Sequence, residues 1–219
     1  MKSSRQYRLL CPIARGLDRV GDRWTLLLLR DLHAGPARFT DLQSSLSGIA
    51  PNLLTERLRT LETEGLIRRE DAGYNVSVYK LTDLGSSTGA LLFELARFGS
   101  QFAPAEEIVR PGNLRNIAIT LKMALAAAIT VTDNLRVELR IDDEQFDICI
   151  ADGQATVFYR RSENPEVVIS TGYSPLLSIG DDEMSPEEFW RDHVEVVTGT
   201  KAKAQRFFEL LVKGFGEAN

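Results

Sequence analysis

The chain is 219 residues long, 43% hydrophobic and 26% charged, with a formal net charge of -5 at neutral pH. That length allows one large or two small domains, and the composition is ordinary for a soluble globular protein. The longest apolar run, residues 123–131, is far shorter than the roughly 20 residues of a membrane-spanning helix. The first residues have no sustained apolar core like that of a signal peptide. We therefore expect a cytoplasmic protein with no membrane partner.

The most informative stretch is residues 39–64, FTDLQSSLSGIAPNLLTERLRTLETE. Its apolar residues recur at spacings of three and four, which predicts two amphipathic helices over residues 39–46 and 50–64. Gly48 supplies the turn between them, and Pro51 suits the first turn of the second helix. The buried stripe of the second helix is predicted to be Leu54, Leu58 and Leu61.

Further elements flank this helix pair. We expect helices over residues 12–20 and 23–32, strands over 66–70 and 76–81, and a last helix from Thr82 to about Phe102. The helix over 23–32 is apolar nearly all round, so it should be buried. The tip between the two strands is Asp71-Ala72-Gly73. Helix, turn, helix and β-wing in this order form a module that lays one helix in the major groove of DNA.

Several polar side chains of the second helix are candidates for DNA contacts, because the N-terminal residues of a recognition helix reach base edges first. Asn52 can pair with adenine, Thr55 can serve a base edge or a phosphate, and Arg59 can meet guanine or a phosphate. Arg57 is better suited to the DNA backbone. The cations in or beside the wing that can contact phosphates are Arg68, Arg69 and Lys80. For each residue the alternative is an ordinary solvated surface position.

The distribution of charge agrees with this placement. Residues 1–104 carry 14 basic and 11 acidic side chains, whereas residues 105–219 carry 12 basic and 20 acidic ones. The basic excess therefore coincides with the predicted helix-turn-helix. DNA would repel the acidic half, which we expect on the far side of the protein from the duplex.

Residues 11–100 resemble the HxlR-type winged helix regulators, relatives of the MarR group. The matching features, in family order, are Cys-Pro, Gly-x-x-Trp, Arg-Phe-x-x-Leu, Gly-Ile, Leu-x-x-Leu-x-x-x-Gly-Leu and Tyr-x-Leu-Thr-x-x-Gly. The resemblance implies a homodimeric repressor or activator that reads palindromic double-stranded DNA. It also implies that the first and last helices of the winged helix form the dimer interface. Family wings often carry prolines before Tyr-x-Leu-Thr, and EDAGYNVSVYKLT has none, which predicts a more mobile wing.

The character of the chain changes after residues 103–113, APAEEIVRPGN, which form the candidate linker. We therefore expect domains over residues 1–104 and 105–219. In the second domain we expect strands over 135–141, 146–150, 155–160, 167–171 and 194–197, and helices over 114–129, 174–179, 186–191 and 201–215. Strands followed by helices predict an α+β domain, with the first four strands in an antiparallel meander and the helices on one face.

Residues 114–215 resemble the sterol carrier protein family. The resemblance is carried by the order strand, short helix, loop, helix, Val-x-Val-x-x-Gly turn and final helix in VVISTGYSPLLSIGDDEMSPEEFWRDHVEVVTGTKAKAQRFFELL. It implies helices that cover one face of a sheet around an apolar tunnel for lipids or other hydrophobic molecules. The candidate lining residues are Phe146, Phe158, Leu176, Leu177, Phe189, Trp190, Phe207, Phe208 and Leu211. The alternative is an ordinary filled core, which any α+β domain needs.

Cys11 has two interpretations. The resemblance implies that a thiol here can sense electrophiles or oxidants, which requires an environment that stabilises the thiolate, and Arg8 and Arg15 are close in sequence. The alternative is a small side chain that packs at the start of the first helix.

Other chemically capable residues give no pattern of an active site. Cys11 and Cys149 lack zinc spacing, and His33 and His193 have no ligand partners at metal spacing. We predict no enzyme activity, no metal and no cofactor. The sequence as a whole predicts a dimeric, sequence-specific repressor controlled by a small apolar effector in the second domain. The alternative is a carrier of lipids or other hydrophobic ligands whose winged helix is a protein-interaction platform.

Overall fold

The computed structural model describes residues 6–73, 76–99, 101–102, 111–180 and 183–218. The chain divides into two compact units, Met1–Asn116 and Ile117–Asn219, and each is described by itself. Most of the expected linker, residues 103–110, lies outside the described residues. In the part of the chain that is described, no helix has both the length and the apolarity needed to cross a bilayer.

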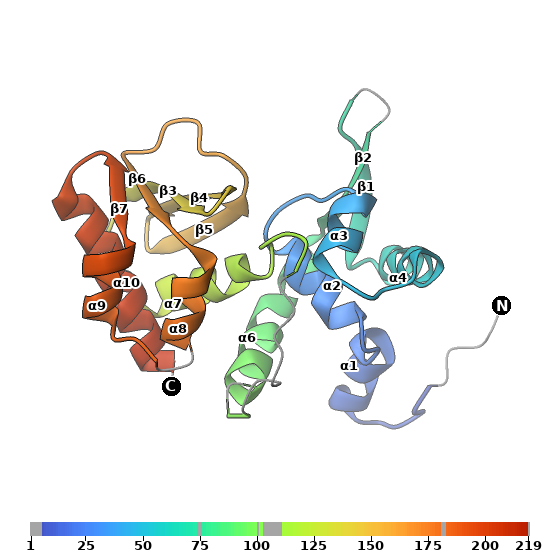
Figure 1. The fold of residues 1–219 in the computed structure, drawn as a ribbon. Helices are drawn as coiled ribbons and strands as arrows, with labels where there is room; N and C mark the ends of the chain where they lie inside the picture. Colours follow the sequence, from blue (N-terminus) through green and yellow to red (C-terminus); the bar gives the residue numbers. More distant parts are fainter. Residues whose placement is uncertain (1–5, 74–75, 100, 103–110, 181–182, 219) are drawn as a thin grey trace. The chain divides into compact units, whose positions relative to one another are not determined.

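The first unit is a winged helix, and Figure 1 shows its hairpin extending from one end while its last helix lies at the other. Its elements are α1 (Pro12–Val20), α2 (Thr25–Leu32), α3 (Phe39–Ser45), α4 (Pro51–Thr63), β1 (Ile67–Asp71), β2 (Ser77–Leu81), α5 (Asp83–Ser86) and α6 (Thr88–Gly99). The expected order of helix, turn, helix and wing is therefore confirmed.

Local chemistry accounts for the ends of the α3–α4 pair. Pro51 is the first residue of α4, where its fixed φ and missing N–H cost nothing. Gly48 in the preceding turn has φ 95° and Gly65 after α4 has φ 71°, conformations in which a side chain is strained. The expected stripe of Leu54, Leu58 and Leu61 is at most 1% exposed, so it anchors α4 to the core.

The last helix of the unit differs from expectation, because it is broken into α5 and α6. Thr82 caps α5 as expected, accepting a hydrogen bond from the Gly85 amide at 3.1 Å. The break follows at Ser87, because the Thr88 hydroxyl donates to the Gly85 carbonyl at 2.6 Å. Hydroxyl side chains that capture a helical carbonyl compete with the backbone ladder in this way.

The second unit pairs a five-stranded sheet with helices, so the α+β class is confirmed. Its elements are α7 (Ile117–Ala128), β3 (Leu135–Ile141), β4 (Glu144–Ala151), β5 (Gln154–Tyr159), β6 (Val167–Thr171), α8 (Tyr173–Gly180), α9 (Pro186–His193), β7 (Glu195–Thr198) and α10 (Lys201–Ala218). The strand order is β5-β4-β3-β6-β7.

The expected antiparallel meander is wrong at β6. This strand pairs parallel with β3, while the β3–β4, β4–β5 and β6–β7 pairs are antiparallel. Asp152-Gly153 makes a tight hairpin between β4 and β5, but the longer connection over 160–166 lets the chain cross to the far side of β3. There β6 is an inner strand, which suits the apolar Val167, Val168 and Ile169, each at most 4% exposed.

The two faces of this sheet have opposite character. One face carries Val137, Leu139, Phe146 and Ile148, which are almost fully buried, and α7 and α10 pack against the sheet (Figure 1). The other face carries Glu138 and Asp147, which lie opposite each other on β3 and β4. Expected alternation along the strands is therefore confirmed.

A polar network covers part of the second face. Glu138 accepts from Arg140 Nε at 2.7 Å and from the Ser162 amide at 2.9 Å. Asp147 accepts from Arg160 Nη2 at 2.8 Å and from the Ser162 hydroxyl at 2.9 Å. Both carboxylates are buried and fully hydrogen-bonded, which holds the β5–β6 connection over the sheet.

Candidate nucleic-acid interface

The exposed face of α4 presents polar side chains outward over a rigid base. Asn52 and Arg59 are exposed, and neither side chain makes a hydrogen bond or ion pair with the described part of the chain. Thr55 is half-buried and its hydroxyl donates to the Pro51 carbonyl at 2.9 Å, which leaves the oxygen lone pairs available. The leucine stripe on the opposite side fixes the orientation of α4. Asn52 and Arg59 are therefore free to bind another molecule.

Arg57 is held differently from Arg59. Its Nη2 lies 2.9 Å from Asp22 Oδ2, and the Arg57 side chain is only 24% exposed. The pair ties α4 to the segment before α2. Arg57 therefore contributes to the placement of α4, and it would have to leave Asp22 to contact a DNA phosphate.

The wing cations lie on both sides of the hairpin. Arg68 and Lys80 are paired in the β1–β2 register, and both lie near Glu70, at 2.6 Å and 3.9 Å. Arg69 pairs with Tyr79 on the other side, and its Nη2 donates to the Ser77 hydroxyl at 2.9 Å. Because Glu70 partly neutralises the first side, Arg69 is the wing cation with the least compensated charge.

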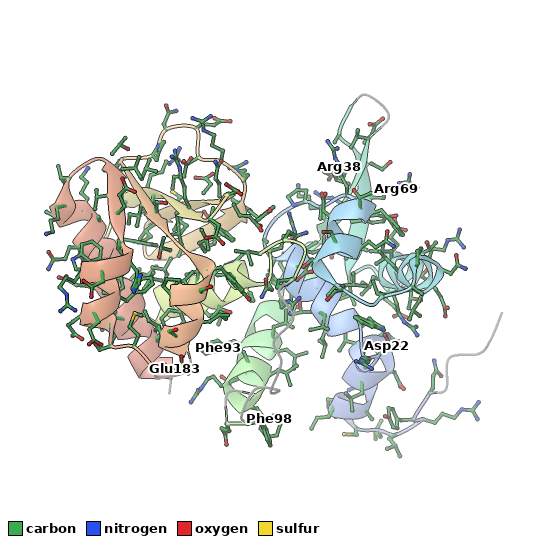
Figure 2. The ribbon with its side chains drawn as sticks, in the orientation of Figure 1. Asp22, Arg38, Arg69, Phe93, Phe98 and Glu183 are labelled. Carbon is green, nitrogen blue, oxygen red and sulfur yellow. The ribbon has the colours of Figure 1, made fainter. Side chains whose placement is uncertain are left out.

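Arg38 is a further candidate that the sequence reasoning did not include. It is exposed and immediately precedes α3, next to Ala37, which forms a β-bridge with Tyr79 of β2. Tyr79 is the register partner of Arg69, so Arg38 and Arg69 occupy neighbouring positions at the base of the wing (Figure 2). The signal was present as the arginine of the Arg-Phe-x-x-Leu motif, directly before a predicted helix start.

Comparisons with known proteins agree with this geometry. Residues 19–107 match the HxlR-like helix-turn-helix family. An uncharacterised HTH-type transcriptional regulator of Synechocystis is 34% identical over 100 residues, which cover 44% of this chain and 73% of that protein. The chain belongs to the HxlR-like helix-turn-helix family. As a family member it is a DNA-binding transcriptional regulator, and the relatives that it matches are transcriptional regulators.

Two further proteins are similar to the same part of the chain. The HTH-type transcriptional regulator YkvN of Bacillus subtilis is 34% identical over 105 residues, covering 43% of this chain and 87% of that protein. The crystal structure of PA1607, a candidate transcription factor, is 39% identical with a TM-score of 0.42, covering 47% of this chain and 74% of that one. The segment matched to the HxlR-like family ends at residue 107, before the second unit begins.

Cys11 of this HxlR-family chain sits at the start of α1. It is a free, half-buried thiol at the N-cap position, and its carbonyl accepts from the Arg15 amide at 3.1 Å. Arg8 and Arg15 are both exposed. This position agrees with a side chain that packs at the beginning of the helix, and it also leaves the sulfur partly accessible.

The histidines and acidic residues do not gather into a site. His33 is buried, and its Nε2 lies 3.2 Å from the Thr88 hydroxyl oxygen, which joins α2 to α6. His193 is exposed at the end of α9. Within the residues that the structure describes, no group of three or more His, Cys, Asp or Glu side chains could hold a metal ion.

The nine candidate ligand-lining residues of the second unit fall into three groups. Phe146, Phe189 and Phe207 are buried core residues, each at most 4% exposed. Half-buried side chains on α8, α9 and α10 form the second group: Leu176, Leu177, Trp190, Phe208 and Leu211. Phe158 stands apart, because its register partner is Asp147 and it therefore lies on the polar face, where Arg160 stacks at 5.1 Å from its ring centroid.

A cavity of about 240 Å³ in the second unit is lined by none of these nine residues. It is lined by Asp133, Asn134, Leu135, Ala202, Lys203, Arg206 and Leu210. Its cations are already paired, Lys203 with Glu166 and Arg206 with Asp133. The hydrogen bond from Arg206 lowers the pKa of Asp133, and that from Lys203 lowers the pKa of Glu166. The cavity therefore presents neutralised charges to a ligand.

Proposed function

We propose that the protein is a dimeric repressor that reads a palindromic operator and is controlled by a small apolar molecule bound in its second unit. The observation that carries sequence-specific reading is the face of α4, where Asn52, Thr55 and Arg59 stand outward above buried leucines. Asparagine and arginine can each form two hydrogen bonds with one base edge in the major groove. Arg38 and Arg69 would then contact phosphates beside the wing.

An exposed apolar stripe supports the homodimer. Leu91, Leu95, Phe98 and Phe102 follow one another at spacings of four, three and four along α6 and just beyond it, and each is 45–63% exposed. Around α1, the exposed apolar side chains include Leu10 at 99% and Ile13 at 74%. Contiguous apolar surface of this kind marks a protein contact. A second copy that covers both helices would also set the spacing of the two α4 helices on DNA.

Half-buried apolar side chains on the helices α8, α9 and α10 of the second unit support an apolar effector. Every described residue of α8 except the exposed Ser174 is half-buried, including Leu176, Leu177 and Ile179. Trp190 on α9 and Phe208 on α10 are also half-buried, and their rings lie 5.2 Å apart. Ligand sites are lined mainly by apolar and aromatic side chains, and these half-buried residues are of that kind. This arrangement of helices on a sheet is what the resemblance to sterol carrier proteins implies.

A selection experiment tests the DNA part of the proposal. Purified protein would select duplexes from a randomised library, and mobility shifts across a salt series would compare the selected duplex with a scrambled one. We expect the selected duplex to be palindromic. The ratio of the affinities for the selected and the scrambled duplex should fall when Asn52 is replaced by alanine. A protein that binds both duplexes equally contradicts sequence-specific reading and favours the carrier whose winged helix serves protein contacts.

A titration tests the effector part. Fatty acyl, sterol-like and aromatic compounds would be added with and without the selected duplex. A Trp24→Phe variant would be used, so that tryptophan fluorescence reports binding near Trp190 alone. We expect one class to quench or shift the fluorescence and to lower DNA affinity, because a ligand shifts an equilibrium only by its difference in affinity between the two states. Unchanged DNA affinity at saturating ligand would contradict control by that ligand.

A further inference from the structure

Residues Gly112–Arg115, here called the strap, lie beyond the segment matched to the HxlR-like family but belong to the first unit. They are packed rather than extended through solvent: Asn113 is 8% exposed, Leu114 0% and Arg115 3%. A buried arginine needs hydrogen-bond acceptors around its charge, so the partners of Arg115 show what the strap holds.

Arg115 binds backbone carbonyls at the end of α2 and in the turn that leads to α3. Its Nε donates to the Asp31 carbonyl at 3.2 Å, and its Nη2 donates to the carbonyls of Gly35 and Pro36, the latter at 3.2 Å. Carbonyls at a helix C-terminus lack intrahelical partners and carry partial negative charge. The planar guanidinium, with five donors, can satisfy several of them at once.

The beginning of the strap binds the other end of α3. Asn113 Nδ2 donates to the Asp41 carbonyl at 2.8 Å, and the Gly112 amide donates to the Ser44 carbonyl at 3.1 Å. A Cβ atom at Gly112 would lie 2.3 Å from Ser44 Oγ and 2.6 Å from the Ser44 carbonyl oxygen. Because backbone stands in the way, only glycine fits this approach.

The strap therefore holds α3 at both ends, through Pro36 before it and Ser44 within its last turn. The same α2–α3 turn contains Ala37, which bridges to Tyr79 in the wing. The turn after Ser45 leads directly to α4. The position of α3 thus bears on both DNA-facing elements, the wing and α4.

We propose that the strap is a positioning element for DNA recognition, in which Arg115 and Asn113 fix α3 and thereby aim α4 and the wing at the duplex. This inference rests on the proposed role of α4 as the recognition helix. Arg115 does not touch DNA in this scheme. Its loss should therefore reduce discrimination between duplexes more than it reduces general attraction to DNA.

The test compares full-length Arg115→Lys and Gly112→Ala with wild type. Lysine keeps the charge but has a single nitrogen, which cannot span the carbonyls that the guanidinium fork joins. We expect the ratio of affinities for the selected and scrambled duplexes to fall roughly tenfold. This factor corresponds to the free energy of one or two hydrogen bonds that position α3. Amide hydrogen exchange over residues 36–46 should accelerate, while exchange in β3 and β4 stays at the wild-type rate. The matched control is Arg161→Lys, which changes an exposed arginine of the second unit.

The outcomes are separable. Variants that are folded by circular dichroism and retain the wild-type ratio of affinities overturn the positioning role. If wild-type protein itself shows no preference between the duplexes, the proposed function fails, and the exchange rates over residues 36–46 still decide whether the strap holds α3. Should Arg115→Lys fail to fold, Asn113→Ala is read with the same two measurements. It removes the hydrogen bond to the Asp41 carbonyl and the one that Asn113 Oδ1 accepts from the Arg115 amide at 3.3 Å.

Discussion

The two units differ in how many large apolar side chains they leave exposed and in how their arginines are paired. Among the described residues, ten large apolar side chains that remain exposed lie within residues 7–102, and three lie within residues 131–215. The first unit leaves Arg59 on α4 without a partner in the described chain. On the polar face of the second unit, by contrast, Arg140 and Arg160 are paired with Glu138 and Asp147 at 2.7 and 2.8 Å.

This difference indicates where each unit makes contacts with other molecules. An exposed apolar stripe marks a protein contact, and an exposed cation without an internal partner can meet a phosphate, so both features agree with the proposed partners of the first unit, DNA and a second copy. The second unit pairs Arg140 and Arg160 with carboxylates on the polar face of its own sheet. Its incompletely covered part is the apolar surface of α8, α9 and α10.

The largest expected effect comes from Phe98→Asp, in the middle of the exposed stripe of α6. A carboxylate at a buried apolar contact is strongly unfavourable, so we expect the dimer to dissociate at micromolar concentration. Affinity for the palindromic duplex should fall about 100-fold or more, because each protomer then binds one half-site alone. Light scattering with size exclusion measures the mass. The control is Val131→Asp, at a 78% exposed position of the second unit, and equal masses for the two variants would contradict the interface.

The variants Arg59→Ala and Arg160→Ala compare the role of an arginine in the first unit with that of an arginine in the second. Loss of Arg59 should remove about 1–3 kcal/mol of discrimination between operator and scrambled duplex, with the unfolding temperature unchanged. Loss of Arg160 leaves Asp147 short of a partner, so stability should fall while DNA affinity stays the same. Fluorescence anisotropy measures the DNA affinity of both variants, and thermal unfolding measures their stability. A loss of DNA affinity in Arg160→Ala would contradict this difference between the two units.

Arg69→Ala should weaken all DNA binding to a similar extent. A phosphate contact carries no sequence information, so operator and scrambled duplex should lose the same factor, and the salt dependence should decrease by about one released counterion. The measurement is the slope of log affinity against log salt. A matched Arg68→Ala variant should change the slope less, because Glu70 already lies 2.6 Å from Arg68.

The variant Asp133→Asn tests how the ion pair between Asp133 and Arg206 contributes to stability as the pH changes. Arg206 lowers the pKa of Asp133 below its ordinary value of 3.8, so the ionised form contributes stability above that value. The contribution is lost as pH falls through the lowered pKa. We expect the variant to be less stable than wild type by at most about 1 kcal/mol near neutral pH, because Arg206 is half exposed to screening solvent. The stabilities of the two proteins should converge in unfolding scans at pH values below the lowered pKa, and a difference that persists there would contradict the assignment.

The smallest expected effect is that of Cys11→Ser. The Cys11 side chain makes no capping hydrogen bond, and the thiol is half-buried at the start of α1. We expect unchanged DNA affinity before and after treatment with diamide or a quinone, measured by mobility shift. A wild-type response to the oxidant that Cys11→Ser abolishes would instead support the sensing interpretation.

Much of the first unit follows from local rules. Pro12 and Pro51 begin helices, Thr82 caps α5, and the leucine spacing of α4 dictates which of its side chains face outward. Each of these features depends on neighbours within one or two helical turns. The pair between Arg57 and Asp22 could not be anticipated, because it joins positions that only the folded chain brings together.

The second unit shows the limit of alternation as a guide. Period-two patterns identified the apolar and polar faces of β3 and β4, but they carry no information on which strand lies beside which. The parallel placement of β6 next to β3 depends on how residues 160–166 cross the sheet, held by Ser162 between two carboxylates. Likewise, Gly112–Arg115 has the composition of a linker, and its burial depends on carbonyls far away in sequence.

The strap also matters for anyone who recombines this protein with others. A chimera cut where the family segment ends, at residue 107, would discard Arg115 and leave the Gly35 and Pro36 carbonyls without the hydrogen bonds that its guanidinium donates. A graft that extends through Arg115 would keep the three buried residues Asn113, Leu114 and Arg115, and with them the hydrogen bonds to the first unit. A fusion of the first unit to another domain would therefore be joined after Arg115, next to the start of α7.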